Sequence, residues 1–158
     1  MFKEITVLGG AGHVGLAFGL ICTSKNIKVH LHDINSKQLN MIKRGKMPHK
    51  ETGAQKLLNK ALQKNLLSFS DNQKDIKLNN MNIICIGTPV DEFLNPQYKI
   101  ILSLVKDLQK IIKNNQHFII RSTVYPGTTD FLYNFLKKNK KKIKLSFCPE
   151  RFVQGSAI

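Results

Sequence analysis

Three glycines and one carboxylate near the amino terminus have the types and the spacing of a phosphate-binding turn. Gly10, Gly12 and Gly15 follow an apolar segment, and Asp33 ends the next apolar segment. In the G-x-G-x-x-G fingerprint the first glycine permits a tight turn, the second lets a diphosphate approach the backbone, and the third lets a helix pack closely on a strand. An acidic residue at the end of the second strand accepts hydrogen bonds from ribose hydroxyls and repels a 2′-phosphate. The spacing therefore predicts a dinucleotide site, for NAD rather than NADP.

A strand before this turn and a helix after it must hold the glycines in place. Residues 2–8 form a short apolar run that indicates a strand, and apolar residues recur at helical spacing over 14–21. Residues 28–32 indicate the second strand, which carries the acidic residue at its end. The strand before the turn, the helix after it and the acidic end of the second strand are thus all present. We therefore expect His13 and Val14 to line the cofactor site together with the glycines.

The rest of the chain alternates between strand-like and helix-like segments, which predicts an α/β fold with a doubly wound parallel sheet of the Rossmann type. No internal repeat or linker divides it, so we expect residues 1–158 to form one NAD-binding domain. The expected strands are 2–8, 28–32, 66–69, 82–86, 117–121 and 144–147, and the expected later helices are 36–43, 54–64, 100–112 and 131–136.

The formal net charge is +15, which makes a nucleic-acid partner a hypothesis to test. The basic residues are mostly lysines spread over the expected helices, with one dense run at 137–142, and the only arginines are Arg44, Arg121 and Arg151. Because arginine is the better reader of base edges, this distribution favours a solvated basic surface over a specific nucleic-acid site.

Neither a membrane segment nor a secretory signal is evident, since no apolar run reaches about 18 residues and the first strand begins at once. We therefore expect a cytoplasmic protein with no membrane partner. Cys22, Cys85 and Cys148 are an odd number, lack metal-ligand spacing and lie in apolar segments. We expect them to be buried core residues, and we expect no metal site.

Polar segments follow three of the expected strands. Parallel sheets bind ligands at the carboxyl ends of their strands, so we expect these segments to converge on the cofactor edge. They are Gly87-Thr88-Pro89-Val90-Asp91, Ser122-Thr123-Val124-Tyr125-Pro126-Gly127-Thr128-Thr129 and Cys148-Pro149-Glu150-Arg151.

Together with the glycine turn, these segments resemble the nucleotide-sugar 6-dehydrogenases, a family that includes UDP-glucose dehydrogenase, GDP-mannose dehydrogenase and the UDP-N-acetylhexosamine dehydrogenases. The motifs occur in the family's order and spacing over the whole chain. The form Pro149-Glu150-Arg151 is more similar to the UDP-N-acetylmannosamine branch than to the UDP-glucose branch, which usually has Pro-Glu-Phe. The resemblance implies an oxidation of the sugar C6 alcohol to a carboxylate in two steps, with two NAD and a cysteine thiohemiacetal, in polysaccharide biosynthesis.

The resemblance also implies roles for particular residues. Thr123 matches the family's threonine near the catalytic water, and Glu150 matches the glutamate that helps to activate water when a thioester is hydrolysed. Gln154 stands where the UDP-glucose and GDP-mannose branches place a second glutamate, and a glutamine cannot act as a base. The positions that match the family's cofactor lining are Gly87, Thr88, Pro89, Ser122 and Thr123.

Most of the family enzyme is expected to lie beyond Ile158. The family's central helix, its catalytic lysine, asparagine and cysteine, and its nucleotide-sugar domain all follow this point, and none of the three cysteines matches the family's nucleophile. We therefore expect the chain alone to bind NAD without oxidising a sugar. The resemblance implies that the longer enzyme acts on a UDP-sugar as a homodimer.

Two other hypotheses stay open. The glycine turn also fits the extended short-chain dehydrogenases and epimerases, and Tyr133-x-x-x-Lys137 with Ser122 upstream supplies the catalytic pair of that class. Tyr133 shares its expected helix with apolar residues, however, where an aromatic ring more often packs. The other hypothesis is a stand-alone NAD-binding module, in which Thr123 and Glu150 have no chemical task.

Overall fold

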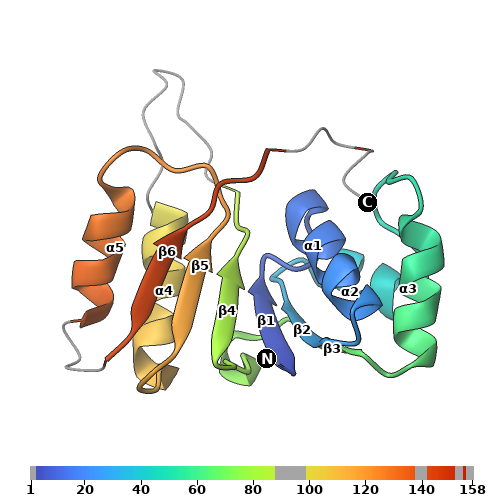
Figure 1. Ribbon diagram of the computed structural model, residues 1–158, viewed down its shortest axis with the longest axis horizontal. Helices are drawn as coiled ribbons and strands as arrows, with labels where there is room; N and C mark the ends of the chain where they lie inside the picture. The colour runs from blue at the N-terminus through green and yellow to red at the C-terminus, as the bar shows by residue number, and fades with distance from the viewer. Residues whose placement is uncertain (1–2, 88–98, 138–141, 152–154, 156–158) are drawn as a thin grey trace.

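The computed structural model shows an open sheet of six parallel strands in the order β3-β2-β1-β4-β5-β6, with helices on both faces (Figure 1). It describes residues 3–87, 99–137, 142–151 and 155. The predicted doubly wound, Rossmann-type fold is confirmed. The strands are β1 (Glu4–Leu8), β2 (Lys28–His32), β3 (Leu67–Ser70), β4 (Met81–Ile84), β5 (His117–Ile120) and β6 (Lys144–Phe147). The helices are α1 (His13–Ser24), α2 (Ser36–Lys43), α3 (Ala54–Gln63), α4 (Lys99–Ile111) and α5 (Thr128–Lys137), with a 3₁₀ turn η1 (Gln73–Asp75).

Each face of the sheet has its own apolar core. Val7 and Ile83 pack with residues of α1, α2 and α3, whereas their neighbours Leu8 and Ile84 pack with residues of α4 and α5. Successive side chains on a strand point to opposite faces, so β1 and β4 are covered on both sides. Even their polar residues Thr6 and Asn82 are fully buried, as expected for strands inside a parallel sheet.

The six strands end in one row across the sheet. Because neighbouring strands are paired at their last residues, the loops that follow them all begin at the same edge. The residues of this row are Ser70, His32, Leu8, Ile84, Ile120 and Phe147.

Strand β4 ends two residues earlier than the predicted segment 82–86. Cys85 N still donates to Leu8 O at 2.7 Å, but the chain then leaves the sheet at Ile86 and Gly87. Strand β5 likewise ends one residue before Arg121. The other predicted elements lie within two residues of their observed bounds, with two exceptions. The helix predicted at 14–21 continues three residues further to Ser24, and the helix predicted at 131–136 begins three residues earlier at Thr128.

The prediction that all three cysteines are buried core residues is wrong for Cys148. This residue follows β6, which is the outer strand of the sheet, and its side chain is exposed. The neighbouring Phe147 is 45% exposed for the same reason. Cys22 and Cys85 are half-buried and pack against the core formed with α1.

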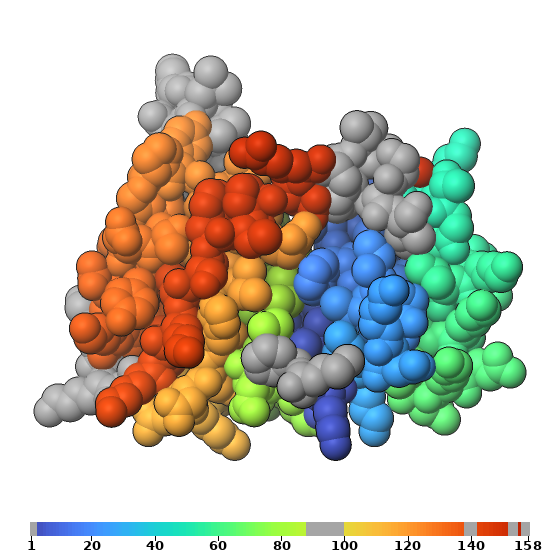
Figure 2. All heavy atoms as spheres, in the orientation of Figure 1, coloured from blue at the N-terminus to red at the C-terminus, as the bar shows by residue number. Residues whose placement is uncertain are grey.

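Residues 148–151 continue from β6 along the carboxyl edge of the sheet toward α1, and they lie on the surface (Figures 1 and 2). Gly155 N donates to Glu51 Oε2 at 3.0 Å, and Thr52 N donates to Gly155 O at 3.2 Å. The end of the described chain is therefore fixed on the α1 side of the sheet. Within the described part of the chain, no helix has the length and hydropathy of a membrane span.

Candidate functional site

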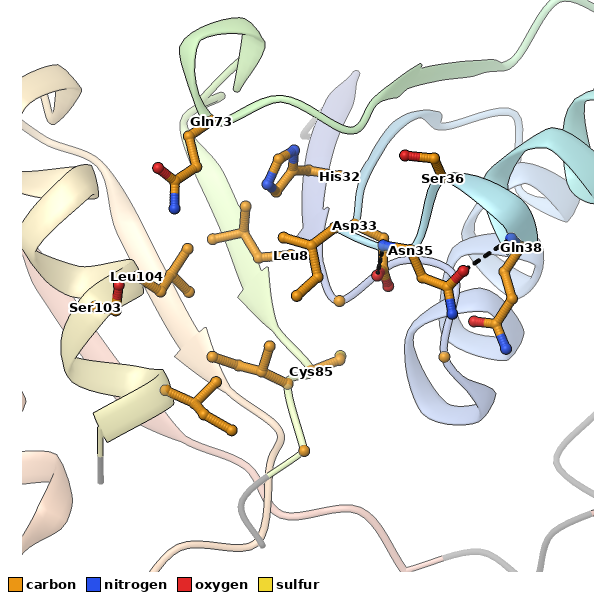
Figure 3. Close-up of a pocket in the computed structure, with 16 residues that line it drawn as sticks. Leu8, His32, Asp33, Asn35, Ser36, Gln38, Gln73, Cys85, Ser103 and Leu104 are labelled. Atoms are coloured by element: carbon orange, nitrogen blue, oxygen red, sulfur yellow. Dashed lines mark hydrogen bonds between the residues drawn. The ribbon is translucent and has the colours of Figure 1, made fainter. Parts of the chain in front are cut away.

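A cleft of about 1010 Å³ opens at the carboxyl ends of β1, β2 and β4 (Figure 3). It lies where the order of strands reverses, which is the usual ligand site of open parallel sheets. The glycine turn, the segment after β2 and α4 form its walls. The lining residues are Leu8, Gly9, Gly12, His32, Asp33, Ile34, Asn35, Ser36, Gln38, Gln73, Cys85, Ile86, Gly87, Ile100, Ser103 and Leu104.

The tight part of the glycine turn is formed by Gly9 and not, as predicted, by Gly10. Gly9 has a φ of +83°, a left-handed conformation that side chains disfavour. Gly10 is needed for another reason, because a Cβ there would lie 2.9 Å from the Cβ of Leu31 on β2. Both amides donate to His32 O, at 2.9 and 3.0 Å, and this anchors the turn to β2.

Gly15 packs α1 closely on the turn, as predicted, and Gly12 leaves open space beside it. A Cβ on Gly15 would lie 2.1 Å from Gly9 O, so only glycine lets α1 start this close to the turn. Gly12 is the N-cap of α1, and a Cβ there would meet only Gly9 O, at 3.5 Å. The cleft side of Gly12 is therefore open, and a phosphate can approach the positive end of the helix there.

Asp33 lies on the wall of the cleft and is held by backbone amides. Its Oδ2 accepts a hydrogen bond from Ala11 N and its Oδ1 accepts one from Asn35 N, both at 2.9 Å, and Figure 3 shows Asp33 beside Asn35. Each carboxylate oxygen retains capacity for a further hydrogen bond. Asp33 is therefore placed to bind a ribose whose hydroxyls point to the end of β2. The open space at Gly12 can receive the diphosphate that is attached to this ribose.

Apolar side chains that sequence reasoning missed form the rest of the cleft. Ile34, directly after Asp33, is 78% exposed, and Ile100 on α4 is 45% exposed. Leu104 faces the cleft from the same helix. Exposed apolar residues on facing walls are suited to a flat base. The sequence indicates this apolar wall through Ile34, which directly follows Asp33.

Arg121 joins three elements at the same edge of the sheet, beyond the row of strand ends. It forms an ion pair with Glu150, whose other oxygen, Oε1, accepts from Arg151 N at 2.8 Å. The guanidinium lies 4.9 Å from the ring centroid of Phe18 in α1, and Nη1 donates to Cys148 Sγ at 3.6 Å. The sequence analysis gave Arg121 no partner, because Glu150 is far away in the sequence.

The structure places Thr123 and Glu150 on neighbouring segments. Each lies three residues beyond the paired strand ends Ile120 and Phe147. Thr123 is exposed, whereas Ser122 is buried and its Oγ donates to Ile86 O at 2.6 Å. Ser122 therefore ties the end of β4 to β5.

Gly87 lines the cleft, as predicted for a cofactor position. His13 and Val14 begin α1 directly after Gly12. The predicted Thr88 and Pro89 lie outside the described residues, as does Gln154.

The thiols within the fold do not favour nucleophilic chemistry. Burial raises the pKa of Cys22 to about 11 and that of Cys85, which lines the cleft, to about 12, while Arg121 acts weakly in the opposite direction. Both thiols stay protonated at neutral pH. In the described part of the chain no group of three His, Cys, Asp or Glu side chains is arranged to hold a metal.

The tyrosine–lysine pair of the short-chain dehydrogenase hypothesis lies away from the cleft. Tyr133 packs against the core formed with α4 and α5, and Lys137 Nζ lies 5.6 Å from its ring centroid. Neither residue is among the described residues that line the cleft. The geometry therefore gives Tyr133 a packing role.

Comparisons with known proteins agree with this site. Residues 3–158 match the profile of the NAD-binding domain of the UDP-glucose/GDP-mannose dehydrogenase family. A UDP-N-acetyl-D-mannosamine dehydrogenase of Methanococcus aeolicus is 29% identical over 153 residues, which are 94% of this chain and 34% of the relative. A GDP-mannose 6-dehydrogenase of Pseudomonas syringae is 31% identical over 123 residues, which are 75% of this chain and 28% of the relative.

A solved structure shows the same arrangement of elements. The UDP-D-ManNAc dehydrogenase of Pyrococcus horikoshii superposes with a TM-score of 0.88 at 26% identity, over 96% of this chain and 37% of that one. The chain thus spans about a third of the length of these relatives.

Proposed function

The chain belongs to the UDP-glucose/GDP-mannose dehydrogenase family, as its NAD-binding domain, and from this we propose that it is the cofactor-binding part of a nucleotide-sugar 6-dehydrogenase that acts on a UDP-sugar. Relatives named as UDP-N-acetyl-D-mannosamine and GDP-mannose dehydrogenases support this class of reaction. The proposal rests on one observation. The cleft with Asp33 and the segments that contain Thr123 and Glu150 all begin at the same edge of the sheet.

Along the edge of the sheet, the residues of the cleft match the successive parts of an NAD molecule. We assign the adenosine ribose to Asp33, the diphosphate to the turn at Gly12 and the start of α1, and the adenine to the apolar walls at Ile34 and Leu104. When bound, NAD supplies the hydride acceptor for the oxidation of an alcohol. The carboxylate at the end of β2 disfavours NADP, because it would face the additional phosphate.

We assign Thr123 and Glu150 to the handling of a water molecule. Arg121 fixes the Glu150 carboxylate, which can then accept a hydrogen bond from a water that attacks a covalent intermediate on the sugar. Thr123, on the neighbouring segment after β5, is assigned to the same water. The protonated thiols of Cys22 and Cys85 are not assigned as the nucleophile, which belongs in this proposal to the longer enzyme.

In the longer enzyme we propose a homodimer that works in the cytoplasm on UDP-N-acetylmannosamine or a related UDP-sugar, in the synthesis of polysaccharides. The 158-residue chain by itself binds NAD in this account without turnover, because the sugar site lies outside it.

The test is an assay of NAD reduction with UDP-N-acetylmannosamine, UDP-glucose and GDP-mannose. It compares the protein isolated from its natural source with the purified 158-residue chain. We expect the natural protein to form two NADH for each UDP-sugar and the chain alone to form none. If the natural protein reduces no NAD with any nucleotide sugar, the proposal is wrong and the chain is a cofactor-binding module without this activity.

A further inference from the structure

Two histidines from distant parts of the sequence meet at the glycine turn. His13 is the first residue of α1, and His49 lies in the loop between α2 and α3. Their rings are stacked, with centroids 3.7 Å apart and planes at 23°. His49 is not one of the predicted site residues, and the proposed function gives it no role.

His49 also bonds to the turn itself. Its Nε2 lies 2.8 Å from Ala11 O, and because a carbonyl oxygen only accepts, Nε2 carries a proton and donates it. Ala11 N donates in turn to Asp33 Oδ2. Ala11 lies between Gly10 and Gly12, so the middle of the turn is held from one side by the ribose-binding carboxylate and from the other by His49.

The surroundings of His13 disfavour its charged form until an anion arrives. Burial, followed by the His49 ring, lowers the pKa of His13, whereas Glu51 raises it. Gly155, whose amide donates to Glu51 Oε2, has no side chain and so adds no charge near Glu51. The positive end of α1 acts in the same direction as burial. A diphosphate beside the turn reverses the balance, because a nearby negative charge favours the imidazolium.

We propose that His49 is a positioning residue of the NAD diphosphate subsite, and that His13, whose ring stacks on that of His49, takes up a proton when the diphosphate binds. His49 fixes the turn through Ala11 and holds the ring of His13 by stacking. This inference rests on the assignment of the cleft to NAD.

His13 therefore makes NAD affinity depend on pH. A group whose pKa is higher in the complex than in the free protein strengthens binding at low pH, and this gain is lost as the pH rises through the pKa of the complex. We expect NAD to bind about fivefold more tightly near pH 6 than near pH 8. Adenosine has no diphosphate, so its affinity should be the same at both values.

Calorimetric titration of the chain with NAD tests this, with adenosine binding followed by NMR shifts. His13→Gln takes up no proton. His49→Gln keeps a donor for Ala11 O, and His49→Phe keeps the stacked ring without a donor. His117→Gln is the matched control, because His117 begins β5 at the opposite edge and bonds to Ser146 Oγ. The wild type and His117→Gln should share one pH slope, and the NAD affinity of His13→Gln should change by less than about twofold between the two pH values. His49→Phe should bind NAD more weakly than His49→Gln at both pH values.

A second measurement needs no variant. The heat of NAD binding to the wild type, taken in buffers with different ionisation enthalpies, should show net proton uptake near neutral pH. Equal NAD affinity at both pH values, a His13→Gln variant with the wild-type slope, or a His49→Phe variant that binds NAD as tightly as His49→Gln would contradict the inference and leave the NAD site intact. Failure of NAD to bind at any pH would overturn the inference and the proposed function together.

Discussion

Arg121 and Glu150 form an ion pair between the end of β5 and the segment after β6. Their side chains are only 16% and 17% exposed, so the pair is largely withdrawn from water. The guanidinium also lies on the ring of Phe18 in α1. The pair thus connects the outer strands to the helix that follows the glycine turn, and it fixes the carboxylate to which we assign the handling of water.

Removal of Arg121 should therefore destabilise the fold. We expect Arg121→Gln to lower the free energy of unfolding by about 2–4 kcal/mol, because Glu150 is left charged and largely buried without its partner. Urea denaturation measures this, and exposed Arg44→Gln is the control, with a change within about 0.5 kcal/mol. The double variant with Glu150→Gln should lose less than the sum of the single variants. Strict additivity would mean that the pair contributes no coupling.

Gly15 should tolerate no side chain. A Cβ there meets Gly9 O at 2.1 Å, so Gly15→Ala forces α1 away from the turn and should cost about 2 kcal/mol or more of stability, together with NAD affinity. Gly87→Ala is the matched control for stability, since a Cβ there has nothing within 4 Å. Thermal melting of both variants compares them, and equal melting temperatures would refute the close approach.

Acid should weaken the fold through His30. Burial, followed by the neighbouring His32, lowers the pKa of His30 to about 4. Its two ring nitrogens each lie 2.9 Å from a serine hydroxyl, Ser68 Oγ and Ser70 Oγ. In the unfolded chain a histidine titrates near its usual pKa of about 6.5, so the unfolded state binds the proton more readily. The stability from this group is present above about pH 6.5 and is lost as the pH falls toward 4.

The size of this effect can be measured by urea denaturation as a function of pH. We expect the free energy of unfolding to fall by about 2–3 kcal/mol from this group between about pH 7 and 4.5. His30→Gln should have a correspondingly flatter pH dependence, whatever its absolute stability. A variant with the wild-type slope over this range would exclude His30 as the source.

The three cysteines should differ sharply toward a thiol reagent. Cys148 is exposed directly after the outer strand β6, whereas Cys22 and Cys85 are partly covered, and burial raises their pKa values to about 11 and 12. Because the thiolate is the reactive form, the native chain should modify at Cys148 first, and the other two should react only after unfolding. Mass spectrometry of the alkylated protein identifies the site, and early labelling of Cys85 would contradict the described burial.

The parts of the site that could be predicted are those that local sequence determines. Gly12, Gly15 and Asp33 lie within one strand–turn–helix–strand unit, so their spacing alone fixes their relation. The positive φ of Gly9 was missed because the fingerprint does not mark which glycine of the Gly9–Gly10 pair takes the left-handed conformation.

The parts that could not be predicted depend on which distant segments meet. The pairing of Arg121 with Glu150 requires that β5 and β6 be neighbours with Ile120 opposite Phe147. His49 reaches Ala11 from 38 residues away, by way of a loop without a motif. Cys148 lies in an apolar segment, as buried thiols do, but its exposure follows from the place of β6 at the edge, which no local pattern reveals.

The central claim is that the cleft binds NAD through Asp33. Its most direct test is the titration of the purified chain with NAD and NADP, compared with Asp33→Asn and with the control Asp130→Asn on the surface of α5. We predict that the wild type and the control bind NAD at least about tenfold more tightly than NADP, and that Asp33→Asn loses most of this preference. A chain that binds neither nucleotide, or an Asp33→Asn variant with the wild-type preference, would contradict the account.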